Sequence, residues 1–393
     1  MSAAPRPPSR DWATDFDHLD ARWGSDPYPI WAGMRETGPV AHTERFEGCY
    51  FPTTHAAVRE VAYDTEHFSS RRIIVRDRRI DPTPAPPITS DPPEHKGWKR
   101  AVLPPFTPDE VAKLEPATRA TCNELIDAFP PGGCDVAEFY TRHIPVRVVA
   151  HLFGLPEGDG DLFRRWIHTI LEAGITDSSL VMPAQREMAA YFAAAIAQRQ
   201  ANPTDDLITR LMHTAIDGRP AAPDDVTSML RLLLVAGIDT TWSAIGSALW
   251  HLAGHPDDAA RLRAEPALLP TAIEELLRAY APVTMAREVV RDTEVQGCPM
   301  KAGNMVLLSF PAANRDPALF PEPDRVILDR AENRHAAFGL GIHRCVGSNL
   351  ARMELTVAVE TFLRRVPSFR LDGPVRWAIG TVRGPRALPM AFG

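Results

Sequence analysis

The segment from Phe338 to Gly347 combines residue types that could hold a metal through sulfur. It reads FGLGIHRCVG, and Gly339 and Gly341 allow the positive-φ conformations that a tight hairpin around Cys345 would need. Cys345 lies just before a helical pattern, so backbone N–H groups at the helix start can stabilise a thiolate. Gly347 lacks a Cβ where a flat ligand would approach, and Phe338 can shield the sulfur from water. The pattern indicates a thiolate ligand for iron.

Two other interpretations of this segment are weaker. A buried, inert cysteine beside a structural hairpin is the usual outcome for a lone cysteine in an enzyme. Three glycines with a Phe, a His and a Cys at these offsets are far more specific than that. A zinc site on His343 and Cys345 lacks two further ligands at suitable spacing.

A second segment, residues 236–241, places an acid beside a hydroxyl within a helical pattern that runs from Asp225 to Leu252. Gly237 is unfavourable inside a helix and threonine side chains compete for backbone carbonyls, so we expect a groove or bulge at this turn. There, Asp239 would supply protons and Thr240 would position oxygen. The alternative is a polar patch on an otherwise buried helix.

Both segments resemble signatures of the cytochrome P-450 superfamily. The cysteine loop is similar to the haem-binding signature, and residues 236–241, AGIDTT, are similar to the motif of the oxygen-activating helix. The resemblance extends from Asp26 to Pro385. Further positions that follow the family flank the loop: Asn333, His335, Leu350, Ala351, Arg352 and Glu354.

The resemblance implies a haem b cofactor with Cys345 as the axial ligand of the iron. Because Asp239 and Thr240 are both present, it implies an O₂-activating monooxygenase rather than one of the peroxide-driven relatives that lack this pair. Other residues are expected to bind the cofactor from the loop and from the oxygen helix: Phe338, Gly339, Gly347, Ala236 and Gly237.

Haem carries two propionates, so cationic or hydrogen-bonding side chains should converge on them from separate segments. The family positions for these contacts are His343, Arg287, His95 and Lys99. Lys99 stands where Arg is usual in the family. Its neighbour Arg100 could therefore take over, or Lys99 could bind as a point charge without the forked geometry of Arg.

Glu275 and Arg278 lie three residues apart on one predicted helix and can form an ion pair. On an exposed helix face this pair would be an ordinary surface contact. The resemblance implies instead a buried structural network around haem, for which Arg330 is the expected third member.

The resemblance places the substrate pocket in five segments: residues 72–89, 166–180, 232–240, 283–285 and 379–382. Most of these residues are apolar, which predicts an uncharged or largely hydrophobic organic substrate. The predicted lining residues are Ile88, Val235, Val283, Met285 and Ile379. One arginine near the first segment could hold a substrate carboxylate, although a solvated loop face is the commoner outcome: Arg71, Arg72, Arg76, Arg78 or Arg79.

Length and composition are those of a globular enzyme, with 393 residues of which 45% are hydrophobic and 24% charged. Long helical patterns predict a mainly α protein, with a minor β-rich side. We expect one cytochrome P-450 haem domain over residues 1–393, with residues 1–15 flexible, a triangular helical part and a long central helix. The helical patterns cover residues 161–173, 182–200, 225–252, 268–280 and 346–365. The strand-like runs cover residues 40–43, 49–53, 289–295 and 305–310, with others near Phe369 and Leu388.

The net charge of −7 is spread along the chain without a long basic run, so nucleic acid is not an expected partner. The sequence contains no apolar run long enough to predict a membrane span, and its first residues do not resemble a signal peptide. We therefore expect a cytoplasmic protein. No fused reductase is recognisable. Electrons are therefore expected from NAD(P)H only indirectly, through a separate ferredoxin or flavodoxin and its reductase. Lys96, Lys99, Arg100, Arg344 and Arg352 could make a basic docking face for such a donor.

Two other functional classes remain open on the residues alone. A haem-based sensor or carrier could share the cysteine loop but would not need Asp239 and Thr240. An enzyme that rearranges oxygenated substrates would bind haem but need no electron donor.

Overall fold

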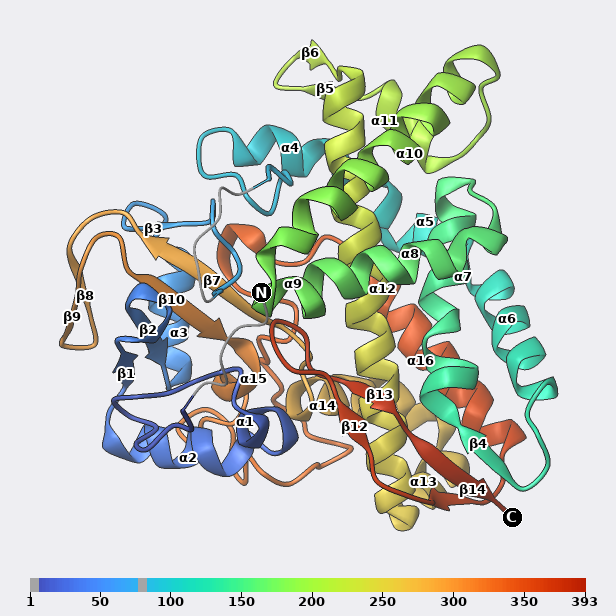
Figure 1. Cartoon of the computed structure of the whole chain (residues 1–393). Coiled ribbons are helices and arrows are strands. Elements are labelled where there is room, and N and C mark those ends of the chain that lie inside the picture. Colours follow the sequence, from blue (N-terminus) through green and yellow to red (C-terminus); the bar gives the residue numbers. More distant parts are fainter. Residues whose placement is uncertain (1–6, 77–82) are drawn as a thin grey trace.

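Helix α12 (Pro223–Gly254) crosses the middle of the molecule (Figure 1). It begins at Pro223, and the Asp225 carboxylate accepts a hydrogen bond from the Ala222 N–H at 2.8 Å. Within residues 7–76 and 83–393, which the computed structural model describes, α12 alone is long and apolar enough to span a membrane. However, 67% of its most apolar window is buried inside the protein, which is typical of a core helix.

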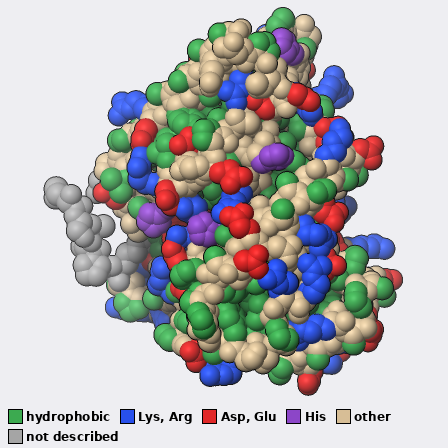
Figure 2. All heavy atoms as spheres, turned by 90° about the vertical axis from the view of Figure 1, so that its right-hand side faces the viewer, with side chains coloured by type: hydrophobic (Ala, Val, Ile, Leu, Met, Phe, Trp, Pro, Cys, Tyr) green, Lys and Arg blue, Asp and Glu red, His purple; other side chains and the backbone are tan. Residues whose placement is uncertain are grey.

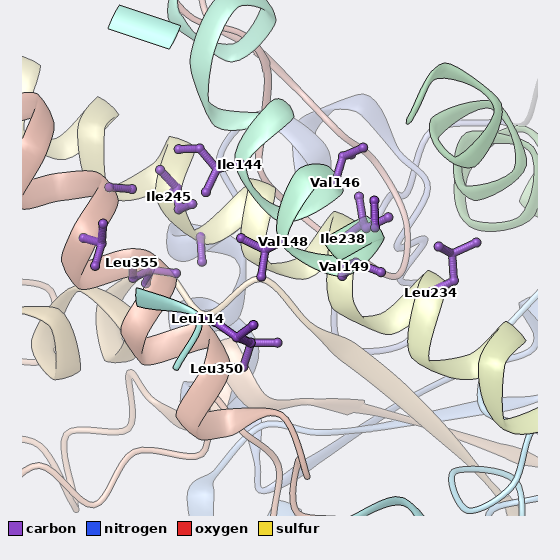
Figure 3. Close-up of a cluster of buried hydrophobic side chains, with 14 of the residues drawn as sticks. Leu114, Ile144, Val146, Val148, Val149, Leu234, Ile238, Ile245, Leu350 and Leu355 are labelled. Carbon is purple, nitrogen blue, oxygen red and sulfur yellow. The ribbon is translucent and has the colours of Figure 1, made fainter. Parts of the chain in front are cut away.

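Helices α7 (His143–Phe153) and α16 (Ser348–Arg365) pack against α12 and form much of the hydrophobic core. Figure 3 shows where their side chains meet: Val148 and Val149 of α7, Ile238 and Ile245 of α12, and Leu355 of α16. Each of these side chains is buried. This packing fixes the middle of α12 relative to the start of α16, the two places where the predicted catalytic residues and the metal ligand lie.

The predicted helical patterns are confirmed, since residues 161–173 form α8 and the π-helical turn that continues it to Ala173. The other four patterns fall on α10, α12, α14 and α16. Helices α6 and α7 were not predicted from the sequence, because the buried stripe of α6 contains the polar Thr118 beside Cys122 and α7 contains Pro145 in its first turn. The remaining helices are α1 (Ala21–Ser25), α2 (Tyr28–Thr37), α3 (His55–Tyr63), α4 (His95–Val102), α5 (Pro108–Ala112), α6 (Glu115–Asp127), α8 (Gly160–His168), α9 (Gly174–Thr176), α10 (Val181–Ala201), α11 (Leu207–Met212), α13 (Pro256–Ala264), α14 (Leu269–Ala279) and α15 (Phe310–Ala313).

The β-rich side is a five-stranded sheet in the order β1-β2-β10-β7-β3, next to α3 (Figure 1). Its central pair is antiparallel and sets Met285 opposite Leu308 and Arg287 opposite Val306. Because side chains alternate along a strand, Met285 and Arg287 share one face of β7. The strands are β1 (Val40–Thr43), β2 (Cys49–Pro52), β3 (Phe68–Ser69), β7 (Thr284–Val289) and β10 (Met305–Ser309).

The predicted strand over residues 289–295 is wrong, because the chain leaves the large sheet at Val289 and turns before pairing again. Val290 is 45% exposed, and the polar residues Arg291 and Asp292 follow it. The apolar residues at 289–290 therefore suggested a continuous strand at a point where the chain turns. The chain then forms the small hairpin of β8 (Thr293–Val295) and β9 (Cys298–Met300). The other short strands are β4 (Gly133–Asp135), β5 (Ala215–Ile216), β6 (Arg219–Pro220), β11 (Phe369–Leu371), β12 (Arg376–Trp377), β13 (Pro385–Ala387) and β14 (Pro389–Phe392).

Acidic and basic side chains are intermixed on the face that α6 and α7 present (Figure 2). Ion pairs join Arg147 to Glu124 at 2.9 Å and Arg119 to Glu360 at 2.6 Å. Among the described residues, this face therefore carries no extended patch of positive or negative charge.

Candidate active site

The Cys345 loop is a tight turn that depends on two glycines. Gly339 and Gly341 have φ values of +72° and +68°, as the sequence predicted. A Cβ on Gly341 would lie 2.4 Å from the carbonyl oxygen of Ala62, so no side chain fits there. The Cys345 N–H donates to the Phe338 carbonyl at 2.8 Å and closes the loop just before α16.

The environment of the Cys345 thiol has two opposing effects on its pKa. Burial raises the pKa, whereas a hydrogen bond from the Gly347 N–H and the positive charges of Lys99 and Arg344 lower it. The stabilising N–H group at the helix start agrees with the sequence analysis. A metal ion at the sulfur would complete the deprotonation.

A cavity of about 280 Å³ lies between the Cys345 loop and α12. Cys345 lines one wall, and Thr240 lines the wall formed by α12. The residues that the sequence predicted to bind the cofactor all line this cavity: Cys345, His343, Arg287, His95, Lys99, Phe338, Gly339, Gly347, Ala236 and Gly237. Tertiary structure thus brings together side chains from α4, β7, α12 and the cysteine loop.

The described helix α12 runs unbroken from Pro223 to Gly254, so the bulge that the sequence suggested at this turn is absent. Thr240 satisfies its hydroxyl locally, by donating to the Ala236 carbonyl at 2.7 Å. A Cβ on Gly237 would lie 3.1 Å from Cγ2 of Val149. The glycine therefore permits close packing against α7 rather than a break in the helix.

Asp239 points away from the cavity that Thr240 lines. Its side chain is 1% exposed, and Oδ1 lies 2.7 Å from Nη2 of Arg386. The angles at this contact do not make an aligned hydrogen bond, so both carboxylate oxygens keep free lone pairs. Burial raises the pKa of Asp239 to about 6, although the charge of Arg386 limits the rise.

A chain of charged side chains leads from Asp239 through Arg386 toward the surface, and it was not predicted from the sequence. Nε of Arg386 donates to Glu172 at 2.6 Å, and Nδ1 of His168 lies 3.6 Å from the other oxygen of Glu172. The His168 side chain is 65% exposed. Arg386 lies near the end of the chain in β13 and Glu172 follows α8, so no local sequence signal connects them to residue 239.

Arg287 is a buried cation without a carboxylate partner among the described residues. Its side chain is 4% exposed and donates to the Ala286 carbonyl at 2.7 Å. Burial lowers its pKa to about 10. His95 and His343 lie edge to face beside it with ring centroids 4.5 Å apart, and Nε2 of His343 lies 2.8 Å from Oγ of Ser70. These groups form a cluster of donors on one side of the cavity.

Lys99 lies against the cysteine loop. Its amino group donates to the Ile342 carbonyl and, at 3.1 Å, to the Arg344 carbonyl. Arg100 is exposed and does not line the described cavity, so of these two neighbours it is Lys99 that faces inward.

Comparisons with known proteins agree with this geometry. The family model for cytochrome P-450 matches residues 178–372. Mycinamicin IV hydroxylase/epoxidase of Micromonospora griseorubida is 33% identical over 91% of this chain and 94% of its own length. The chain belongs to the cytochrome P-450 family. Monooxygenase PikC of Streptomyces venezuelae is also 33% identical, over 96% of this chain and 94% of its own.

A solved structure of a cytochrome P-450 from Chondromyces apiculatus superposes with a TM-score of 0.87 and 31% identity, over 97% of this chain and 98% of that one. The helical and β-rich parts described above therefore make up the cytochrome P-450 fold. The protein is a monooxygenase of the oxidoreductase class, and its family implies a haem cofactor.

The residues around the cavity fit a haem in a cytochrome P-450. A thiolate at Cys345 would be a suitable ligand for the haem iron. The buried guanidinium of Arg287, beside His95 and His343, requires an anion that the described protein does not supply, and a propionate is such an anion. Gly347 lines the cavity next to the sulfur, since a Cβ there would stand 3.9 Å from Sγ of Cys345.

The predicted structural network of the P-450 is present and buried. Nε of Arg278 lies 2.8 Å from Oε2 of Glu275, and both side chains are 0% exposed. Nε of Arg330 lies 3.0 Å from the same oxygen. Asn333 also donates to Glu275, at 3.1 Å. The network ties α14 to the segment that leads into the Cys345 loop.

Four of the five predicted substrate residues line the cavity: Ile88, Val235, Val283 and Met285. The fifth, Ile379, does not line it. Ile379 is 38% exposed and its side chain packs against Gly24. Thr381 and Val382, two and three residues further along the chain, line the cavity instead. Of the loop arginines, Arg78 and Arg79 lie outside the described residues.

Proposed function

We propose that this cytochrome P-450 inserts one oxygen atom from O₂ into a largely apolar organic substrate, by hydroxylation, epoxidation or dealkylation. The observation that carries the proposal is one cavity whose lining includes Cys345 of the loop, Thr240 of α12 and mostly apolar residues. The naming of a relative as a hydroxylase/epoxidase supports the first two reactions.

Each polar residue has a separate role in this proposal. Cys345 holds the haem iron, while Arg287, His95 and His343 hold the propionates. Bound haem supplies the reductive activation of O₂. The Thr240 hydroxyl, which donates to the Ala236 carbonyl, would turn to hydrogen-bond the oxygen. Asp239 would supply protons from that turn of α12, with its carboxyl group held beside Arg386, which in turn pairs with Glu172.

Electrons are proposed to come from NAD(P)H through a reductase and a separate ferredoxin or flavodoxin in the cytoplasm. Lys96, Arg100 and Arg344 are exposed and can form the docking face. Two members of the expected face are otherwise engaged. Lys99 turns inward, and Nε of Arg352 lies 2.6 Å from Glu274.

The sulfur ligand is tested with carbon monoxide. The reduced holoenzyme should show the strongly red-shifted Soret band of a thiolate-ligated carbonyl complex, and Cys345→Ser should lose it. Cys122→Ser, at a buried cysteine away from the loop, is the control and should keep the band. A variant at position 345 that keeps the band contradicts the assignment.

The role of Thr240 is tested by the yield of product per reductant consumed. Thr240→Ala should still consume reductant but should form several-fold less product, because the oxygen loses its hydrogen-bonding partner. Thr240→Ser keeps the hydroxyl and should restore most of the yield. Product that forms without any reductant would instead favour a rearranging enzyme, and an absence of product would favour a sensor or carrier.

A further inference from the structure

A second cavity, of about 160 Å³, adjoins the first one on the side of the loop before α4. The two cavities share apolar lining residues: Ile73, Ile74, Ile88, Leu171, Leu232 and Val235. The boundary that the two cavities share is therefore formed by apolar side chains.

Arg231 of α12 lines this second cavity and is only partly compensated there. Its Nη2 donates to the side-chain oxygen of Gln185, whereas its Nε is buried without any hydrogen-bond partner. Burial lowers its pKa, and no acidic residue in the described ranges offsets the effect. A neutral amide satisfies one donor of a guanidinium but does not balance its charge.

Arg76 lines the same cavity under similar conditions. It donates to the Gly174 carbonyl, and burial lowers its pKa with no carboxylate in the described part of the chain to counter this. Two neighbouring arginines differ. Arg72 is paired with Glu288 at 2.9 Å, and the side chain of Arg71 is 77% exposed.

A partly buried arginine without a carboxylate partner is unfavourable, since its charge has lost water and gained no opposite charge. A solvated arginine would not keep Nε out of contact with water, so an ordinary surface role does not describe Arg231. A bound anion would supply both the missing charge and the missing acceptor. A carboxylate does so best, because its two oxygens match the fork of the guanidinium.

We propose that the substrate of this enzyme is an amphipathic organic acid whose carboxylate binds Arg231, with Arg76 adding positive charge to the same cavity. The apolar part of the acid runs along α12 to the space between Thr240 and Cys345. This inference rests on the proposed monooxygenase function and narrows its substrate class. It revises the expectation of an uncharged substrate, which was drawn from the apolar wall alone.

The position of Arg231 sets the length of such an acid. Arg231 and Thr240 are nine residues apart on one continuous helix, which at 1.5 Å per residue is about 13 Å. The carbon that is oxidised must therefore lie far from the carboxylate. Short acids cannot reach both ends.

The experiment measures how tightly the ferric holoenzyme binds paired probes, by the spin-state shift of the haem and independently by calorimetry. The probes are octanoate, decanoate, dodecanoate and tetradecanoate, each with its methyl ester. At least the longer acids should bind about 10-fold or more tightly than their esters, as expected of a charge-assisted hydrogen bond. Arg231→Gln should remove this preference, and Arg231→Lys should keep part of it.

Arg71→Gln is the matched control, because Arg71 lines the same cavity and the variant loses the same charge from an exposed side chain. It should leave the preference unchanged, whereas Arg76→Gln should reduce it. The proposal is overturned if no acid binds, if acids and esters bind equally, or if the variants at 231 and 71 behave alike. The carbon monoxide spectrum of each variant separates this failure from a failure of the haem-thiolate function.

Discussion

At the scale of single residues, Asp239 shows how burial changes the acidity of a carboxyl group. An ordinary aspartate is ionised at neutral pH and holds its proton too weakly to deliver it. Here burial raises the pKa to about 6, so that the carboxyl group exchanges protons near neutral pH. Arg386 keeps the shift moderate and links the group to Glu172.

The first prediction concerns the pH dependence of turnover. A proton donor acts in its protonated form, so product formation limited by proton delivery should fall as pH rises through about 6. Asp239→Asn should remove this limb and lower turnover by roughly 100-fold at neutral pH. The measurement is the rate of product formation against pH with excess electron donor.

The matched control for this profile is Asp205→Asn, at a side chain that is 85% exposed. It should leave both the rate and the profile unchanged. If the profile of the variant at 239 equals that of the wild type, Asp239 does not deliver the proton.

The second prediction compares two glycines with left-handed backbones. Gly297 has φ +81° and open space around its missing Cβ, so Gly297→Ala should lower the free energy of unfolding by about 1 kcal/mol. Gly341 has φ +68° and faces the Ala62 carbonyl, so Gly341→Ala should lower it by about 3 kcal/mol or more. Denaturant unfolding and the haem content measure the two effects. Only the variant at 341 should lose haem, and equal effects would show that the loop tolerates a side chain.

At the scale of elements, α14 is held to the segment before the cysteine loop by a buried ion-pair network. Glu275 accepts hydrogen bonds from Arg278, Arg330, Asn333 and the Ile327 N–H. All of its oxygen contacts come from the protein interior, so its charge is fully compensated. The two arginines depend on it in turn, because a buried cation without a partner is unfavourable.

The third prediction follows from that dependence. Glu275→Gln should lower the free energy of unfolding by about 3–5 kcal/mol, since it leaves two buried arginines undercompensated. Glu360→Gln removes the partly exposed partner of Arg119 and should change it by less than about 1 kcal/mol. Thermal unfolding of both holoenzymes is the measurement. Similar melting temperatures of the two variants would contradict a structural role for the network.

At the scale of the whole molecule, the fold pairs some of the basic side chains near the cysteine loop with protein groups and leaves others exposed. Lys99 and Arg352 are engaged with loop carbonyls and with Glu274, whereas Lys96, Arg100 and Arg344 stay exposed. Exposed charges act on a partner over a distance that salt shortens, from about 30 Å at low ionic strength to about 8 Å at physiological ionic strength.

The fourth prediction is that Arg344→Glu slows reduction by an acidic donor protein more at low salt than at high salt. Stopped-flow reduction by ferredoxin or flavodoxin at two ionic strengths measures the rates. Arg370→Glu reverses a charge on β11 in the C-terminal sheet and should change neither rate. An equal slowing by the variant at 344 at both salt concentrations would exclude electrostatic steering.

The sequence by itself determined the conformation of the Cys345 loop, because the loop is local. Its glycine conformations, its sulfur and the helix start that follows are encoded within ten residues, and the structure confirms their arrangement. The long helices were predictable for a similar reason, since a periodic apolar pattern depends on near neighbours. The turn at Val290 and helix α6 were not, because their patterns are short or mixed.

Only the tertiary structure decided which distant charges meet. Arg386 reaches Asp239 from the end of the chain. Arg231 and Arg76 line one cavity from separate segments, and neither arginine pairs with an acidic residue in the described part of the chain. It also directed Ile379 outward and kept α12 unbroken at Gly237. Such contacts join residues far apart in sequence, so the balance of burial and charge at each one exists only once the chain has folded.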